Sequence, residues 1–260
     1  MTYTIIQFEE RDGVGCITLN RPDVLNSFNR QMALETQHAL DHCAARESIR
    51  AVYLTGEGRA FCAGQDLAEA IDPEGPELTK IVGEHYNPII QKIRALEKPV
   101  VAGVNGVAAG AGANIALACD ITYAANSAKF IQAFSMIGLI PDSGGTFFLP
   151  RLVGMQRATA LMMLGDRVSA EKAESWGMIY QAVDDEQLQE TAFATAKKLA
   201  KMPTVGLGLT KRALNASMHH NLGQQLDLEE ELQTIAGNTH DYNEGVNAFL
   251  DKRKPDFQGR

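Results

Sequence analysis

Runs of β-forming and apolar residues, which are typical of strands, occur along the first part of the chain, and stretches with helical spacing separate them. Residues 3–8 and 14–19 are rich in β-forming side chains, and the turn-prone Arg11-Asp12-Gly13 between them predicts a hairpin. Helical spacing follows over residues 29–45, and the apolar run 51–55 predicts a buried strand.

The same order of strand and helix then repeats. A helix predicted over about residues 80–95 leads into the apolar run 98–106, and a second helix over residues 112–118 leads into a strand over residues 120–125. A short extended piece follows at residues 127–130. Strands that alternate with helices are typical of parallel pairing through crossover helices, so the pattern predicts an α/β fold.

The second half of the chain is mostly helical in pattern. Beyond Gly144 strand patterns become scarce, and only residues 179–183 predict another strand, before a helix over residues 185–200. From Pro203 onward, apolar residues recur at amphipathic helical spacing with no strand pattern beneath them. We therefore expect a core of residues 1–195 and a C-terminal helical region of residues 196–260, which must pack on the core or on another subunit.

Composition and charge narrow the class of protein. The 260 residues are 45% hydrophobic and 22% charged, which is typical of one large folded domain. The net charge of −8 disfavours nucleic acid and anionic membrane surfaces as partners. The most apolar stretch, residues 99–118, is interrupted by Asn105 and several glycines, so we expect a buried strand and helix there and no membrane span.

The cysteines and the N-terminal segment favour a cytoplasmic protein. The four cysteines are far apart and form no CxxC pair, which indicates reduced thiols. Residues 1–13 contain acidic residues and lack the basic flank and apolar run of a secretory signal. We expect no targeting segment.

Two glycine-rich turns follow apolar runs and are the first candidates for chemistry. They are FCAGQDL at residues 61–67 and NGVAAGAGAN at residues 105–114. A glycine-rich turn that opens a helix presents free N–H groups and the positive end of the helix dipole, which suit an anion or a developing oxyanion. A dinucleotide fingerprint starting at Gly110 would need glycine where Ile115 stands, so we exclude a Rossmann site.

Asp142 is the candidate proton carrier. It is the only acidic residue in the apolar stretch 134–148. A carboxylate in such surroundings loses solvation, so its pKa should rise toward neutrality. This predicts a general acid or base.

Other polar residues have structural interpretations that we prefer. His38 and His42 are four positions apart and Cys43 follows His42, which is a possible spacing for metal ligands. The polar face of a surface helix explains them equally well, and we expect no metal site. Cys62 lies in the first glycine-rich turn, where a buried packing residue is favoured over a nucleophile. Asp66 is predicted to cap a helix.

Several motifs occur in register along the chain and resemble one known family. In order they are NRPDVLNSF, GRAFCAGQDL, KPVVAGVNGVAAGAG, ACDITYAANSAKF, IPDSGGT and GVNAFLDKRKPDF. Together they resemble the enoyl-CoA hydratase/isomerase, or crotonase, family over nearly the whole chain. Within that family the motifs are most similar to the isomerases of 1,2-epoxyphenylacetyl-CoA in phenylacetate degradation.

The resemblance implies a fold and a class of ligand. It implies the ClpP/crotonase-like α/β fold of repeated ββα units, in which C-terminal helices make trimer contacts. It further implies a homotrimer or a dimer of trimers and an acyl-CoA substrate. No separate cofactor is expected, because coenzyme A is part of the substrate.

The resemblance also assigns the catalytic positions. The backbone N–H groups of Gln65 and Ala111 correspond to the pair that binds the thioester oxygen, and Asp142 corresponds to the single acidic residue of the isomerases. Asn114 and Phe134 stand where the hydratases carry two glutamates. Neither side chain is a general acid or base, so the resemblance favours isomerisation, which one base can perform, over hydration.

Coenzyme A and acyl contacts are implied with less detail. Asn114 could orient the ligand or Asp142, or only satisfy neighbouring backbone. His85 and Tyr86 precede a helix that borders the acyl pocket in the family, so one of them could line that pocket. Lys254 lies in the basic run 252–254, which a neighbouring subunit could supply or which could be a solvated helix end. The remaining substrate-binding positions implied by the resemblance are Asp23, Val24, Leu25, Ala63, Leu67, Gly110 and Phe134.

The expected activity is conversion of 1,2-epoxyphenylacetyl-CoA to oxepin-CoA, together with a shift of a double bond from the 3- to the 2-position of enoyl-CoA. Two alternatives stay open: a hydratase or hydrolase of the same fold, and a non-catalytic member that binds protein or RNA. The negative charge and Asp142 disfavour the second. A complex with a partner enoyl-CoA hydratase is also open.

Overall fold

The computed structural model describes residues 2–260 and is built around two sheets. The larger sheet has six strands in the order β1-β2-β3-β5-β7-β10, of which β1 and β2 form an antiparallel hairpin and the rest pair in parallel. Its strands are β1 (Ile6–Arg11), β2 (Val14–Leu19), β3 (Ala51–Gly56), β5 (Val100–Val104), β7 (Ile121–Ala125) and β10 (Gln181–Val183).

A smaller second sheet lies beside the first and consists of strands of three residues each. Its order is β4-β6-β8-β9, with β4, β6 and β8 parallel and β9 antiparallel. The strands are β4 (Ala60–Cys62), β6 (Val107–Ala109), β8 (Lys129–Ile131) and β9 (Arg167–Ser169).

The two sheets are connected by a repeated unit. Each of β3, β5 and β7 is followed at once by a short strand of the second sheet, and then by helical segments. This repeat of strand, strand and helix confirms the predicted ββα architecture. Its helices are α2 (Leu67–Ala70), α3 (Leu78–Lys80) and α4 (Asn87–Ala95) in the first unit, α5 (Ala111–Ala118) in the second, and α6 (Gly145–Val153) and α7 (Met155–Leu164) after the third.

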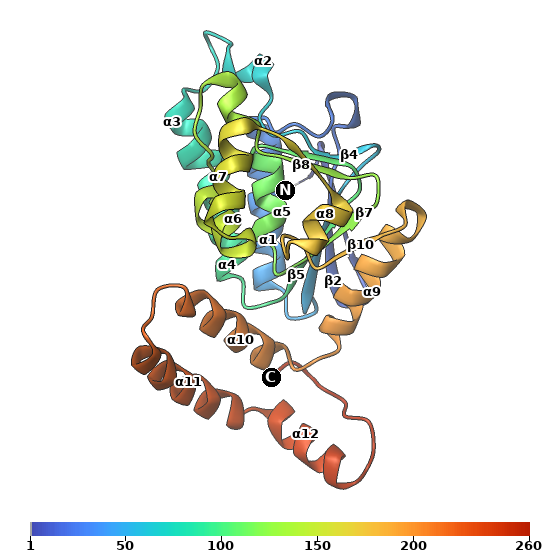
Figure 1. Cartoon of the computed structure of the whole chain (residues 1–260). Coiled ribbons are helices and arrows are strands. Elements are labelled where there is room, and N and C mark those ends of the chain that lie inside the picture. The colour runs from blue at the N-terminus through green and yellow to red at the C-terminus, as the bar shows by residue number, and fades with distance from the viewer. Residues whose placement is uncertain (1) are drawn as a thin grey trace.

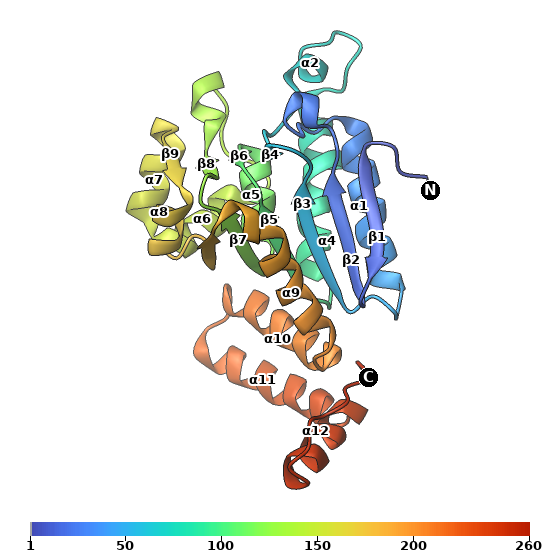
Figure 2. The same ribbon diagram turned by 90° about the vertical axis from the view of Figure 1, so that its right-hand side faces the viewer.

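Helices cover both faces of the larger sheet. Figure 2 shows α9 (Leu188–Ala200) on one side of the strands, and α1 (Arg30–Ala45) and α4 on the other. Every residue of β3 is buried, as expected for a parallel strand that is covered on both faces. Helix α5 is also buried along its whole length and packs on α4, on α6, and on β4 and β6 of the second sheet.

The last helices extend away from this core. Helices α10 (Thr204–Ser217), α11 (Leu222–Gly237) and α12 (His240–Leu250) form an arm at the end of the molecule opposite α2 (Figure 1). The guanidinium of Arg50 ties both ends of the arm to the core, because it donates to the carbonyls of Met202 (2.6 Å) and Phe257 (2.8 Å). The division expected after residue 195 falls inside α9.

No helix among residues 2–260 has the length and apolar character needed to cross a membrane. The remaining elements are α8 (Ala170–Ser175), the 3₁₀ turns η1 (Pro22–Val24), η3 (Ala133–Ile137) and η4 (Asp185–Gln187), and the π-helical turn η2 (Ile81–Tyr86).

Two predicted elements differ from those observed. The first strand begins at Ile6 and not at residue 3, and the buried carboxylate of Glu35 accepts from the N–H groups of Thr4, Ile5 and Ile6 where the strand enters the sheet. The helix predicted over residues 80–95 is interrupted by η2. Pro88 has no N–H to bond to the carbonyl of Glu84, which instead accepts from the side chain of Gln37 (2.7 Å).

Candidate active site

The first glycine-rich turn directs one N–H group away from its own neighbours. Phe28 pairs with this segment by donating its N–H to the Gly64 carbonyl (2.7 Å) and by accepting from the N–H of Asp66 (2.8 Å). Successive peptide groups of an extended segment point to opposite sides, so the N–H of Gln65 faces away from Phe28. Within residues 2–260 that N–H has no acceptor.

The second glycine-rich turn leaves a matching donor. Gly110 adopts φ 53° and ψ −126°, a conformation that side chains disfavour, and its own N–H donates to Ile131. Ala111 is the first residue of α5, so its N–H has no acceptor in the helix. The described part of the chain supplies no other acceptor for it.

The two turns are in direct contact. A Cβ atom on Gly64 would lie 2.9 Å from the carbonyl oxygen of Ala109 and 3.7 Å from the nitrogen of Ala111. A Cβ atom on Gly112 would lie 2.4 Å from the carbonyl oxygen of Cys62. Glycine at these positions is therefore what allows the backbones to approach, and the structure brings the turns that contain Gln65 and Ala111 together.

Asp142 is held by the helix that begins at the second turn. Its carbonyl oxygen accepts from Nδ2 of Asn114 (2.9 Å), which is one helical turn from Ala111 on α5. Burial raises the pKa of the Asp142 carboxyl, and a hydrogen bond from Ser143 Oγ (2.8 Å) opposes that rise in part. A carboxyl with a raised pKa is suited to accept and return a proton.

Asn114 holds the Asp142 segment. The side chain is fully buried, and its Oδ1 accepts from Nε2 of Gln132 (2.8 Å) while its Nδ2 donates to Asp142. A Cβ atom on Gly145, at the start of α6, would lie 2.4 Å from this Nδ2. Both ends of the Asn114 amide are thus occupied by protein. The sequence analysis missed Gln132, although it is the only polar residue in the segment 130–134 and could have been singled out for that reason.

The carboxylates of Asp66 and Glu69, near the first turn, are held by hydrogen bonds and an ion pair within the protein. Asp66 caps α2 by accepting from the N–H of Ala68 (3.1 Å), as predicted, and pairs with Arg21 (2.9 Å). Glu69 accepts from the backbone N–H of Arg30 (2.9 Å). Among the described hydrogen bonds, the Asp142 carboxylate has only the Ser143 hydroxyl as a side-chain partner.

The segment expected to hold coenzyme A lies against the first turn. The carbonyl of Leu25 accepts from the N–H of Ala63 (2.9 Å), while Asp23, Val24 and Leu67 are exposed. Phe134 is buried, with its ring 3.7 Å from the position of a Cβ atom on Gly110. These residues, with Asn114, surround the turns. Lys254 does not join them within one chain, since it follows α12 at the opposite end of the molecule (Figure 1).

The remaining candidates have ordinary partners. Cys62 is fully buried, and burial raises the pKa of its thiol to about 12, which suits packing and not nucleophilic attack. His38 contacts the Tyr3 hydroxyl (2.9 Å), and His42 contacts Glu10 (2.8 Å). Residues 2–260 contain no cluster of three His, Cys, Asp or Glu side chains that could hold a metal ion.

The chain is similar to known proteins over its whole length. The family model for enoyl-CoA hydratase/isomerase matches residues 9–260. The 1,2-epoxyphenylacetyl-CoA isomerase of Escherichia coli is 52% identical, and the match covers 95% of this chain and 96% of the relative. A protein of Rhodobacter capsulatus named "probable enoyl-CoA hydratase" is 46% identical over 100% of both chains.

Solved structures agree with these matches. The enoyl-CoA hydratase from Bacillus anthracis superposes with a TM-score of 0.92 at 32% identity, covering 99% of this chain and 100% of that one. Both the sequence and the two-sheet fold with its helical arm are therefore those of one group of enzymes. The chain belongs to the enoyl-CoA hydratase/isomerase family.

Proposed function

We propose that this enzyme isomerises acyl-CoA thioesters, converting 1,2-epoxyphenylacetyl-CoA to oxepin-CoA and shifting the double bond of 3-enoyl-CoA to the 2-position. The single observation that carries the proposal is the state of Asp142. It is a half-buried carboxylate with a raised pKa, its backbone is bonded to Asn114 on the helix that begins at Ala111, and the carboxylates of Asp66 and Glu69 are held by structural partners.

The arrangement favours one-base chemistry. Hydration of a double bond requires one group to activate water and another to deliver a proton. Asn114 is an amide whose two ends are bonded to protein, and Phe134 is an apolar ring. An isomerisation gains and loses no atoms, so one carboxylate that removes a proton and returns it elsewhere is sufficient.

The mechanism starts with the thioester carbonyl oxygen between the N–H groups of Gln65 and Ala111. Asp142 removes a proton from the α-carbon, and the negative charge that moves to the oxygen is stabilised by both donors. Removing one such donor in other enzymes costs about 3 kcal/mol of transition-state stabilisation. In the epoxide substrate both C–O bonds are kept, and the carbon–carbon bond shared by the epoxide and the six-membered ring breaks, which gives the seven-membered oxepin ring. Asp142 returns the proton that it took from the α-carbon to a carbon of that ring, so no atom is gained or lost.

The carrier part of the substrate is proposed to lie along the exposed residues Asp23, Val24 and Leu67, next to Ala63. The coenzyme is part of the substrate, so the proposed reaction requires no further cofactor. Lys254 is proposed to bind the phosphates of coenzyme A on a neighbouring subunit, since it lies away from the turns of its own chain.

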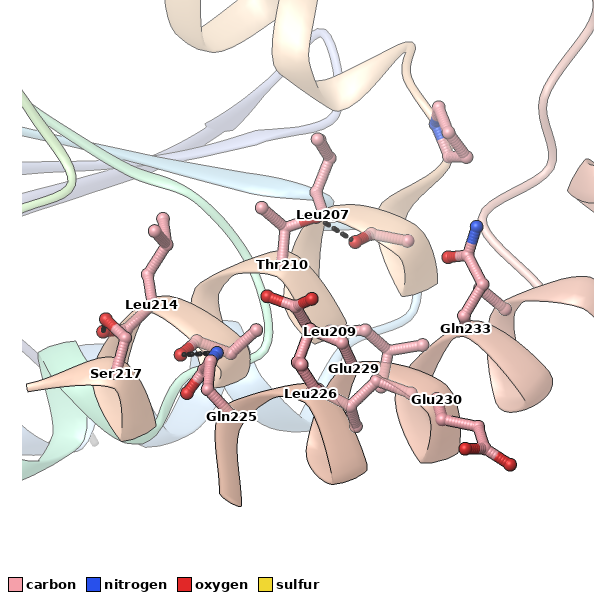
Figure 3. A pocket seen from close by; sticks show the side chains of 15 residues that line it. Leu207, Leu209, Thr210, Leu214, Ser217, Gln225, Leu226, Glu229, Glu230 and Gln233 are labelled. Carbon is pink, nitrogen blue, oxygen red and sulfur yellow. Dashed lines mark hydrogen bonds between the residues drawn. The ribbon is translucent and has the colours of Figure 1, made fainter. Parts of the chain in front are cut away.

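The helical arm supports the proposal of a homotrimer or a dimer of trimers. A groove of about 1000 Å³ lies between α10 and α11, and Figure 3 shows leucines of both helices along it, including Leu214 and Leu226. Exposed apolar side chains continue onto α12, where Phe249 is 83% exposed. Apolar surface of this extent indicates a contact with another chain. We further propose a cytoplasmic location. Co-purification with an enoyl-CoA hydratase would test the expected complex with such a partner.

The test is an assay of the purified protein with 1,2-epoxyphenylacetyl-CoA, a 3-enoyl-CoA and a 2-enoyl-CoA, with products identified by mass and NMR. We expect products of unchanged mass from the first two substrates. A gain of water by the 2-enoyl-CoA without any double-bond shift in the 3-enoyl-CoA would overturn the proposal in favour of a hydratase. Light scattering that gives a stable 28.2 kDa particle would contradict the proposed trimer.

A further inference from the structure

The hydroxyl of Tyr86 donates a hydrogen bond to Oε1 of Gln65 (2.9 Å). Tyr86 thus contacts the first glycine-rich turn, although it lies outside both glycine-rich sequence motifs. Gln65 is also the residue whose backbone N–H has no acceptor within residues 2–260. A bond that fixes the Gln65 side chain therefore also restricts the orientation of this N–H.

Tyr86 is rigidly placed. It is the last residue of the π-helical turn η2, it is fully buried, and its ring packs on that of Phe28 with centroids 5.8 Å apart. Phe28 also bonds the backbone on both sides of Gln65. Burial raises the pKa of the Tyr86 hydroxyl well above its usual value, and the nearby charges of Asp142 and Glu69 add to this, so the group stays a neutral donor.

The other end of the Gln65 amide is held as well. Its Nε2 donates to Oε2 of Glu69 (3.2 Å) and to the carbonyl of Asp66 (3.3 Å). Glu69 is in turn fixed by the backbone N–H of Arg30 at the start of α1. The Gln65 side chain therefore bridges a buried phenol on one side and a fixed carboxylate on the other.

We propose that Tyr86 is a positioning residue for the oxyanion site, which acts through the Gln65 side chain to keep the Gln65 N–H aimed at the thioester oxygen. The inference rests on the proposed function for its ligand. Tyr86 itself does not take part in proton transfer. Its contribution is the orientation of one backbone donor, in which an error of a fraction of an ångström weakens the stabilisation of the enolate.

The first experiment compares Tyr86→Phe with the wild type. The substitution keeps the ring on Phe28 and removes only the hydroxyl. We expect kcat to fall about 3- to 10-fold with KM changed less than about 2-fold, as for the loss of one hydrogen bond that matters more in the transition state. Tyr53→Phe is the matched control, because Tyr53 is also buried and donates to Gln189 Oε1 (2.7 Å) away from the turns. We expect normal kcat for that variant.

The second experiment reads the donor directly without turnover. The infrared carbonyl band of bound phenylacetyl-CoA reports how strongly the thioester oxygen is hydrogen-bonded. The Tyr86→Phe variant should show a smaller shift from the free ligand than the wild type or Tyr53→Phe. An unchanged shift would overturn the proposal. If wild-type protein shifts the band yet isomerises no substrate, the proposed function fails, while the band of Tyr86→Phe still decides the role of Tyr86.

A double variant distinguishes the positioning role from a direct one. If Tyr86 acts through Gln65, then Tyr86→Phe should cause no further loss of kcat in a Gln65→Met background. An equal fold-loss in both backgrounds would show that the hydroxyl acts on the substrate or on Asp142, and would refute the proposal. Thermal unfolding of each variant separates these effects from loss of stability.

Discussion

Helix α5 ends in opposite ways at its two termini. At the N-terminal end it begins after Gly110 with no side-chain cap, and among residues 2–260 no acceptor faces the N–H of Ala111. At the C-terminal end the carbonyl of Ala118 accepts from Arg94 Nη1 (3.0 Å). Asp120, two residues later, pairs with Arg94 (2.9 Å) and with Lys211 (2.7 Å).

The two ends differ in where their hydrogen-bond partners come from. At the N-terminal end a ligand could supply the acceptor, and at the C-terminal end the protein's own side chains supply the donors. A buried donor without a partner costs about 1–3 kcal/mol, so such a group persists where a ligand can supply the missing acceptor. The charged network at the other end holds α5 and α10 together with the chain's own side chains. Under the proposed function the N-terminal end of α5 serves the reaction and the C-terminal end serves stability, so substitutions at the two ends should separate activity from folding.

The largest expected effect is at the reactive end. Asp142→Asn keeps the size of the side chain and removes the base, so kcat for isomerisation should fall by about 10²- to 10⁴-fold. The hydrogen bond from Asn114 reaches the backbone of residue 142 and should survive, so the circular dichroism spectrum should not change. Activity within about 3-fold of the wild type would remove Asp142 from the mechanism.

The next largest effect is at the C-terminal end and concerns stability. Lys211 is buried and also donates to the Ile93 carbonyl (2.6 Å). Lys211→Met should lower the free energy of unfolding by about 3–5 kcal/mol, because it leaves a mostly buried charge with one partner fewer. Urea titration measures this.

The matched control is Lys197→Met, which breaks a pair with Asp12 (2.8 Å) whose side chains are 40% and 43% exposed. It should change the free energy of unfolding far less than Lys211→Met does, because the pair is exposed to solvent. Folded Lys211→Met protein should retain its kcat. A large loss of kcat with normal stability would mean that the two ends of α5 are not independent.

The comparison is sharpened by Gly64→Ala. Gly64 has φ +95°, and the new methyl group would press on the Ala109 carbonyl at 2.9 Å. Moving one oxyanion donor should lower kcat by about 10²-fold, and the strain should lower the free energy of unfolding by about 1–3 kcal/mol. Gly83→Ala is the control, since a methyl group there meets no atom within 4 Å. Equal activity of the two variants would argue against the placement of the oxyanion site.

The smallest effect is on the pH dependence. The base must be ionised, and the pKa of Asp142 is raised by burial, so kcat/KM should rise with pH through a pKa above that of an ordinary aspartate. For stability the sign is opposite. The folded state binds the Asp142 proton more tightly than the unfolded state, so this residue's contribution to stability falls as pH rises through the folded pKa. Asp142→Asn should therefore gain stability relative to the wild type between acid and neutral pH, as measured by unfolding at several pH values.

Local features of the site could be predicted from the sequence. The two glycine-rich turns are short motifs that follow apolar strands, and Asp142 stands alone among apolar neighbours, so each was visible within a window of about ten residues. The Asp66 cap is equally local. Strands of the larger sheet could be predicted for the same reason, because β2 is rich in β-forming residues and β3 carries an apolar run.

Features that depend on distant partners could not be predicted. The bonds of Asn114 join residues 18 and 28 positions away, so its role became visible only in the folded chain. The N–H groups at the start of β1 bond to Glu35, about 30 positions along the chain. The strands of the second sheet have three residues each, too few for a periodic pattern. The missing N–H of Pro88 was the one readable signal for η2.

The bonds of Arg50 to the arm have a consequence for folding during synthesis. The bond to the Phe257 carbonyl spans 207 residues, so it cannot form until nearly the whole chain has left the ribosome. The sheet, by contrast, contains only residues up to Val183. During synthesis the core can therefore collapse while α10 to α12 are still being made, and their exposed leucines are fixed in place last. The apolar surface of the arm is therefore made only after the core strands, so it is absent during the early folding steps.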